Sequence, residues 1–335
     1  MVFLCCLCLV SCEGTDMVEG EPGNVGRAMT VSLRFAGSRA PDYDAGGGRI
    51  EDVCIAVFDE NDNMEEFVRM PAKEMGEGLS ARLLVATGPK TVHAVANASE
   101  ALAGDLAAAD TKEEFLSVVT SLDRDNTVTE TATLLLMYGS INGNDSVIDV
   151  APADAGGLSS CTIEMGRMVS KICLHKIANL ISEPPVWKGC DISVTGIFLL
   201  DAVAQDCIGE GRTSRPVYAD QEYTPLLGDI VTDCNLDYGS SYEKGPFAYY
   251  TYPSSGDRVT KLCLETVLKK GDARRKCYYS IPVEGMRRNR MYNINCITIK
   301  SEGTDNPGDE HSYDYVSVNL DDALWDAGED TILEY

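Results

Sequence analysis

Residues 28–35, AMTVSLRF, decide the fold class predicted for this chain. Four apolar side chains, Met29, Val31, Leu33 and Phe35, alternate there with polar ones. A period of two that includes β-branched and aromatic residues predicts a β-strand with one buried face. Burial of such side chains stabilises a sheet by about 1.5–3 kcal/mol each. The sheet that receives this strand is therefore predicted to depend on it.

The segment that follows, residues 36–48, is predicted to be an exposed loop because small and turn-forming residues dominate it. Arg39 and Ala40 stand near its start, and GGG occupies residues 46–48. A loop of this composition with an arginine inside it is accessible to proteases.

The N-terminal side of the strand predicts export. Residues 1–12 form an apolar run that ends LVSC, with a small residue directly before Cys12. The run is shorter than the ~20 residues of a membrane span, but it fits a signal-peptide core of about 7–15 residues. This layout is typical of a bacterial lipoprotein signal, whose cysteine carries the acyl chains that tether the mature protein. We favour the lipoprotein signal; one fact supports the alternative, an apolar N-terminus without a targeting role, namely that no Lys or Arg precedes the run.

Residues 13–27 are acidic and rich in glycine, which predicts a flexible tether. Further along, apolar runs separated by turn clusters predict strands over 50–58, 83–86, 91–96, 131–137, 167–175, 191–200, 261–267, 291–300 and 315–320.

One helix is predicted over 111–122. Thr111 and Glu114 form a capping box, and the apolar residues Phe115, Leu116, Val118, Val119 and Leu122 share one face. Many short strands with few helices predict an all-β protein of β-sandwich architecture. A boundary near residue 164 divides it into halves of similar size.

Composition excludes some classes of partner. The chain has 335 residues, 53 Asp and Glu against 28 Lys and Arg, and a formal net charge of −25. Such a surface repels a phosphate backbone and anionic lipid, so nucleic-acid binding is disfavoured.

Nine cysteines follow Cys12, and none belongs to a C-x-x-C pair, so a zinc site has no support. Their odd number implies at least one free thiol, and their pairing cannot be deduced from the sequence. Several occupy apolar positions of predicted strands, where a buried structural cysteine is expected.

No catalytic pattern emerges. Cys173 and His175 lie two residues apart on a predicted strand and could form a nucleophile pair, but no orienting partner is evident. A packed pair on a sheet face is favoured. The run from Asp59 begins like a calcium loop, yet Met64 and Met70 replace the required Gly and Glu, which favours a hairpin turn. We predict no enzyme, metal site or cofactor.

Several segments, taken in their order along the chain, match the pattern of one known protein family. They are the run that ends at Cys12, residues 28–35 followed by Arg39 and Ala40, and residues 49–61, 86–91, 95–98, 167–172, 289–294, 298–300 and 303–307. Together they resemble the fimbrillins, the FimA-type subunits of Bacteroidales type V pili.

The resemblance implies two tandem transthyretin-like β-sandwich domains, over 40–164 and 165–335. It also implies a lipoprotein precursor, lipidated at Cys12 and carried to the outer membrane, and a mature subunit in a surface fimbrium. An arginine-specific protease would remove the segment 13–39, and Arg39–Ala40 matches the cleavage position; Arg27 and Arg49 are the alternatives.

Loss of the strand that contains Met29, Val31, Leu33 and Phe35 would expose an apolar groove at a cost of about 6–12 kcal/mol. The unpaired main-chain N–H and C=O groups along this groove would accept a strand from another subunit. The candidate donor residues lie in the acidic C-terminal region: Val316, Val318, Leu320, Ile332, Leu333 and Tyr335.

Three hypotheses compete. The first is a polymerising pilus subunit, of the stalk or the tip. The second is an uncleaved surface lipoprotein or pilus anchor that retains its first strand and binds a host or glycan ligand. The third, an envelope enzyme, rests only on Cys173 and His175.

Overall fold

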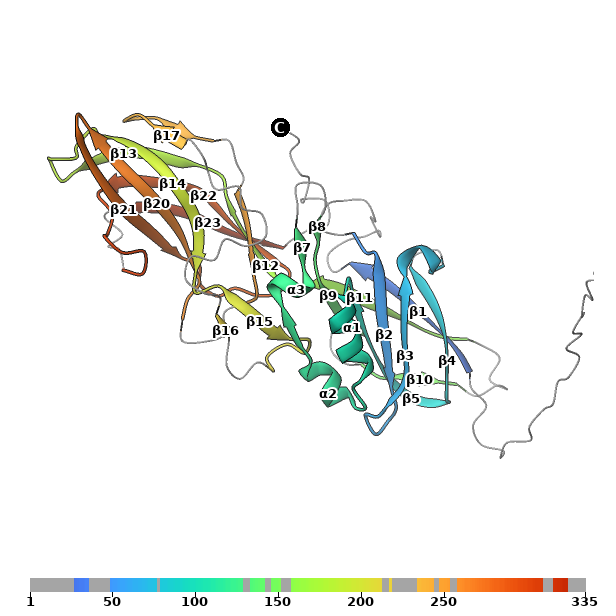
Figure 1. Ribbon diagram of the computed structural model, residues 1–335. Helices are drawn as coiled ribbons and strands as arrows, with labels where there is room; N and C mark the ends of the chain where they lie inside the picture. Colours follow the sequence, from blue (N-terminus) through green and yellow to red (C-terminus); the bar gives the residue numbers. More distant parts are fainter. Residues whose placement is uncertain are drawn as a thin grey trace, which may run out of the picture.

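The protein is all-β with a few short helices (Figure 1). The computed structural model describes residues 27–35, 49–76, 79–128, 133–141, 146–151, 158–212, 217–218, 234–243, 247–253, 258–309 and 316–324. Side chains are described for these residues except 27–28, 34–35, 128, 133 and 316–324. The all-β prediction is confirmed.

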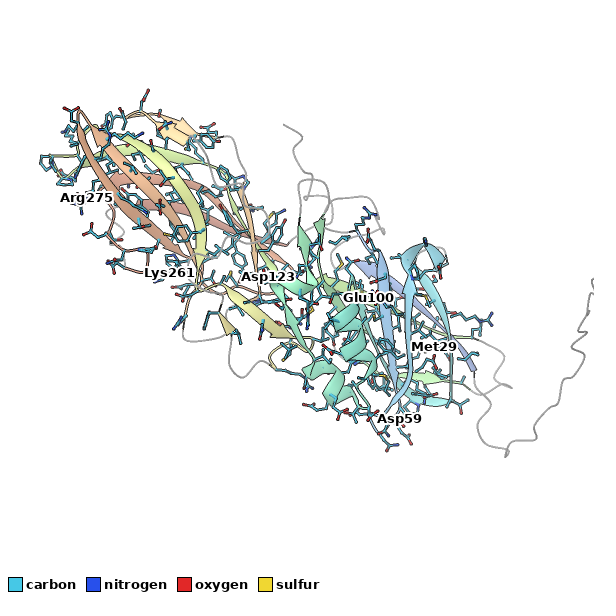
Figure 2. The ribbon with its side chains drawn as sticks, viewed as in Figure 1. Met29, Asp59, Glu100, Asp123, Lys261 and Arg275 are labelled. Carbon is cyan, nitrogen blue, oxygen red and sulfur yellow. The ribbon has the colours of Figure 1, made fainter. Side chains whose placement is uncertain are left out.

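The strands gather in two groups, which we call the N-terminal and C-terminal lobes (Figure 1). Asp59, at a turn of the first lobe, and Arg275, at the far end of the second, mark distant ends of the molecule (Figure 2). Sheet membership changes between residues 167 and 170, a few residues after the boundary predicted near 164.

The N-terminal lobe is built on an eight-stranded sheet with the order β3-β2-β5-β9-β11-β1-β4, in which β10 also pairs with β5. The strands are β1 (Arg27–Phe35), β2 (Asp52–Phe58), β3 (Met64–Pro71), β4 (Ser80–Val85), β5 (Gly88–Ala96), β9 (Met137–Ser140), β10 (Ile148–Val150) and β11 (Ser159–Arg167). A 3₁₀ turn (Ala72–Glu74) follows β3, and β7 (Thr127–Val128) pairs with β8 (Thr133–Leu134).

The C-terminal lobe packs a six-stranded sheet against a four-stranded one. The first contains β12 (Ser170–Leu174), β13 (Ile177–Glu183), β18 (Ser241–Tyr242), β19 (Phe247–Thr251), β22 (Arg290–Ser301) and β23 (Val316–Leu324). The second contains β14 (Asp191–Leu200), β17 (Cys234–Leu236), β20 (Lys261–Lys270) and β21 (Ala273–Pro282). Apolar residues from both sheets form the core between them.

A three-stranded sheet joins the lobes: β6 (Val119–Ser121) pairs with β15 (Val203–Cys207), which pairs with β16 (Val217–Tyr218). One core cluster also crosses the joint, since Phe115 and Leu122 of the N-terminal lobe pack in it with Tyr250 and Met291. Main-chain pairing and a shared core therefore couple the lobes.

The strand predictions hold with shifted ends, and β14 has the predicted bounds 191–200. The described part of the predicted 131–137 strand is instead the two-residue strand β8, the connection at Leu135 and Leu136, and the start of β9.

The prediction of one helix over 111–122 is wrong beyond Ser117. Helix α2 (Lys112–Ser117) ends there, Val119 begins β6, and Leu122 begins the short helix α3 (Leu122–Asp125). The carbonyls of Leu116 and Val118 accept hydrogen bonds from Gly209 and Ile208, so pairing with the second lobe overrides the helical period. Thr111 does cap the helix, since its Oγ1 accepts from the Glu114 amide.

The sequence prediction also missed helix α1 (Glu100–Ala107), which Ser99 caps by accepting a hydrogen bond from the amide of Leu102. Its apolar face consists of only Leu102, Ala103 and Leu106, so the helical period is weak.

Candidate functional site

The first strand lies inside the N-terminal sheet, with a neighbour on each side. β1 pairs in parallel with β11, from Met29↔Ser159 to Phe35↔Met165, and antiparallel with β4, from Arg27↔Val85 to Ser32↔Ser80. Both edges of its backbone are thus engaged in ladders. Removal of β1 would leave a slot with unpaired groups on both walls.

The inward face of β1 fills the core of the lobe. Met29 and Val31 are fully buried, and Leu33 is buried to within 2% exposure. They pack in a cluster that includes Ala81, Leu83 and Val85 of β4, Cys161, Ile163 and Met165 of β11, and residues of β2 and β5. The alternation predicted from the sequence is confirmed for these three residues; Phe35 belongs to β1 by its backbone, and its side chain lies outside the described part of the structure.

β4 depends on β1 more than β11 does. β11 also pairs with β9, whereas β4 has a ladder only with β1 among the described strands. One wall of the slot is therefore an edge strand.

The predicted processing residues Cys12, Arg39 and Ala40 lie outside the described residues. Of the alternatives, Arg27 is the first residue of β1 and pairs with Val85, so a cut after it would leave the strand in place. Arg49 is exposed and forms a 2.8 Å ion pair with Glu51 just before β2.

Of the six predicted donor residues, three lie in a described strand and three lie outside the described residues. Val316, Val318 and Leu320 belong by their backbones to β23, which pairs along nine positions with β22 of its own lobe. Ile332, Leu333 and Tyr335 lie outside the described residues.

The two residues weighed as a nucleophile pair, Cys173 and His175, both contact other parts of the C-terminal lobe or the joint. Cys173 is buried in the cluster that crosses the joint. His175 lies just past the end of β12, and its Nε2 is 2.9 Å from Oδ1 of Asn293.

Seven of the nine cysteines after Cys12 are buried. Burial raises the pKa of the Cys54 thiol to about 12 and that of the Cys161 thiol to about 11.

The Asp59 run forms the predicted hairpin turn between β2 and β3. Oδ1 of Asp59 accepts hydrogen bonds from the amides of Asn61 and Asn63, at 2.8 and 2.9 Å. This turn chemistry explains the D-x-N-x-N pattern without an ion. In the part of the chain that the structure describes, no cluster of three or more His, Cys, Asp or Glu could hold a metal ion. Likewise, none of its helices is long and apolar enough to cross a membrane.

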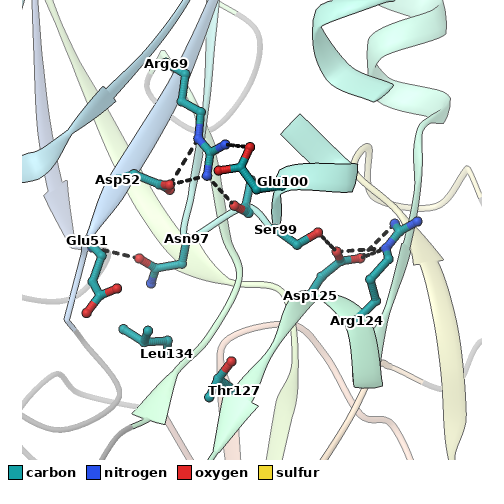
Figure 3. Close-up of a pocket in the computed structure, with 11 residues that line it drawn as sticks. Glu51, Asp52, Arg69, Asn97, Ser99, Glu100, Arg124, Asp125, Thr127 and Leu134 are labelled. Carbon is teal, nitrogen blue, oxygen red and sulfur yellow. Dashed lines mark hydrogen bonds and ion pairs between the residues drawn. The ribbon is translucent and has the colours of Figure 1, made fainter. Parts of the chain in front are cut away.

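A polar pocket of about 230 Å³ lies between the start of β2 and helices α1 and α3 (Figure 3). On one side, the guanidinium of Arg69 donates to Oδ2 of Asp52 and to the carbonyl of Ala98, and it pairs with Glu100 at 2.9 Å.

On the other side of the pocket, the fully buried carboxylate of Asp125 accepts from Ser99 at 2.6 Å, from Thr120 at 2.9 Å and from Arg124. Burial alone would raise the pKa of Asp125, but these hydrogen bonds outweigh it and hold the pKa below its usual value. Apart from Oδ1 of Asp52, which is buried without a hydrogen-bond partner, these charged groups are tied to their neighbours by ion pairs and hydrogen bonds and serve as a structural joint.

A family model and several solved structures are similar to this chain. The family model of the major fimbrial subunit protein FimA matches residues 29–149, which run from β1 to β10. No curated protein matches the chain.

Solved structures match over most of the chain. A candidate cell adhesion protein of Bacteroides eggerthii is 16% identical, with 91% of this chain and 97% of that chain covered and a TM-score of 0.63. A fimbrilin of Porphyromonas gingivalis is 15% identical, with 89% and 97% covered and a TM-score of 0.59. The tip fimbrial protein Mfa3 of the same species is 14% identical, with 90% and 100% covered and a TM-score of 0.50.

The fold is thus one that fimbrial and adhesion proteins of bacteria share. The resemblance to the fimbrillins is confirmed, and the N-terminal lobe carries the FimA family pattern.

Proposed function

We propose that the chain is a structural subunit, of stalk or tip, in a cell-surface fimbrium. It is made as a lipoprotein precursor with Cys12 lipidated, carried to the outer membrane, cut after Arg39 by an arginine-specific protease, and polymerised by donor-strand exchange. Its partners are other fimbrial subunits. The two domains are transthyretin-like sandwiches.

One observation carries this proposal: β1 occupies an interior slot of its sheet and is also the first of the described strands along the chain. Burial of Met29, Val31 and Leu33 contributes about 5–9 kcal/mol at 1.5–3 kcal/mol each. The segment 13–39 contains the whole of β1, so one cut after Arg39 would empty the slot. A strand from another subunit then regains the same burial and the same ladders.

The position of β23 supports a C-terminal donor. It pairs only with β22 among the described strands, so it is an edge strand that could leave its sheet without breaking a second ladder. Similarity to both a fimbrilin and a tip protein leaves stalk and tip as alternatives.

Substitution of Arg39 tests the cleavage step. We expect Arg39→Ala to keep residues 13–39 and to remain monomeric on the cell surface, while Arg49→Ala, the control in the same connection, assembles like the wild type. Immunoblots and electron microscopy of surface material measure both. Assembly of Arg39→Ala would refute this site, and a block in Arg49→Ala alone would move the cut to Arg49.

A further inference from the structure

β4 must stay in place if the slot is to be refilled, although β4 loses its ladder when β1 leaves. Apart from the packing of Ala81, Leu83 and Val85 in the core cluster, the described main-chain hydrogen bonds of β4 outside that ladder lie at or next to its two ends. At the first end, Gly76 and Ser80 exchange two main-chain hydrogen bonds, of 2.8 and 3.3 Å. At the second end, the chain turns through Ala86 and Thr87 into β5.

The second end is held by Glu65 of β3. One carboxylate oxygen of Glu65 accepts a hydrogen bond from the amide of Ala86. The other lies 2.7 Å from Nζ of Lys90, whose side chain is only 5% exposed. A single carboxylate therefore binds both the end of β4 and the start of β5.

A β-bulge directs this carboxylate. Phe58 pairs with Met64, and Val57 pairs with Glu66, so Glu65 is the extra residue of the hairpin. Bulges turn a side chain away from the direction that strand alternation gives it. The almost fully buried ammonium of Lys90 fixes the carboxylate in this position, because a buried charge is costly to leave without its partner.

We propose that Glu65 and Lys90 form a latch that holds β4 against the lobe while the slot of β1 is empty, so that the slot keeps both walls for an incoming strand. This inference rests on the proposed strand exchange. In it, Glu65 is a positioning residue: its described side-chain contacts are with Ala86 and Lys90 and not with β1, and it acts through Ala86 and β4.

The latch predicts how β4 behaves when β1 is displaced. Arg82 is an exposed residue in the middle of β4, and trypsin can cut after it only if β4 leaves the sheet. In the full chain, Val31→Asp places a charge on the buried face of β1 and displaces that strand without removing it.

The experiment compares variants in the Val31→Asp background, with mass spectrometry to measure the rate of cutting after Arg82. Glu65→Gln/Lys90→Met keeps an acceptor for the Ala86 amide and leaves no lone buried charge, whereas Glu65→Ala/Lys90→Met removes the acceptor. We expect the Ala variant to be cut about tenfold faster than the Gln variant, a difference that corresponds to about 1.4 kcal/mol in local opening.

The control is Asp52→Ala/Arg69→Met, which removes a more exposed ion pair from the same β2–β3 hairpin, away from β4. It should cut after Arg82 at the rate of the Val31→Asp parent. With Val31 intact, all variants should resist, because β1 then holds β4. If Val31→Asp abolishes the near-ultraviolet circular dichroism of the fold, Val31→Ser replaces it.

Equal rates of cutting after Arg82 for the Ala and Gln variants would overturn the latch. The same holds if Val31→Asp with Glu65 and Lys90 intact is cut as fast as the Ala variant. The readout needs neither cleavage at Arg39 nor polymerisation. Failure of the wild type to assemble would therefore refute the proposed function and not the latch.

Discussion

Asp125 shows how one residue secures a joint of this protein. Its carboxylate connects the cap of α1 at Ser99, the strand β6 at Thr120 and the neighbouring Arg124. Thr120 in turn lies 2.7 Å from the hydroxyl of Tyr252, which belongs to the other lobe. A buried ion thus stands at the start of a polar chain across the interface.

We expect Asp125→Asn to lower the free energy of unfolding at pH 7 by about 1–3 kcal/mol, because the amide weakens the hydrogen bonds that the buried carboxylate accepts from Ser99, Thr120 and Arg124. The pKa of Asp125 is depressed in the folded state, so its stabilisation is present above the unfolded value near 3.9 and is lost as the pH falls through the folded value. The difference between variant and wild type should therefore shrink below about pH 4.

Urea unfolding at several pH values measures this difference. Asp123→Asn, an exposed residue of the same helix, should change the unfolding free energy by less than about 0.5 kcal/mol. A difference for Asp125→Asn that stays constant down to pH 3 would contradict the assignment.

For single strands and helices, the order of apolar and polar residues predicts the features that neighbouring residues in the chain determine, but not the pairing between distant segments. The alternation at Met29, Val31 and Leu33 specifies a strand because one face meets the core. The pattern does not reveal that β1 pairs with β11, some 130 residues away, because parallel pairing is set by topology.

Helix α2 is the opposite case. Its cap at Thr111 was predictable from the sequence, but its end at Ser117 depends on hydrogen bonds from residues 208 and 209 of the other lobe. The latch was equally hidden, since the bulge at Glu65 is visible only once β2 and β3 are paired.

At the scale of the whole molecule, charge is unevenly distributed. Residues 49–167 contain 21 Asp and Glu against 8 Lys and Arg, a net charge of −13, while residues 310–335 contain eight acidic residues and no Lys or Arg. Residues 168–309 are nearly neutral, with 18 acidic and 17 basic residues. A C-terminal donor must therefore approach an acceptor lobe of the same sign.

This repulsion predicts that assembly of the cleaved subunit is faster in salt. Exposed charges are screened over about 30 Å at 0.01 M ionic strength and about 8 Å at 0.15 M. We expect the polymerisation rate, followed by light scattering, to rise several-fold between these conditions. Asp321→Asn/Asp322→Asn should raise the rate in low salt and flatten the dependence, and a rate that falls with salt would contradict the assigned donor and acceptor.

We claim that β1 is shed so that its slot can be refilled, and the N-terminus of the protein recovered from the cell surface tests this most directly. Mass spectrometry of the mature chain should find Ala40 as the first residue. A chain that still begins with a lipidated Cys12 would contradict the claim, because the slot would then remain filled by its own strand, as in an uncleaved anchor.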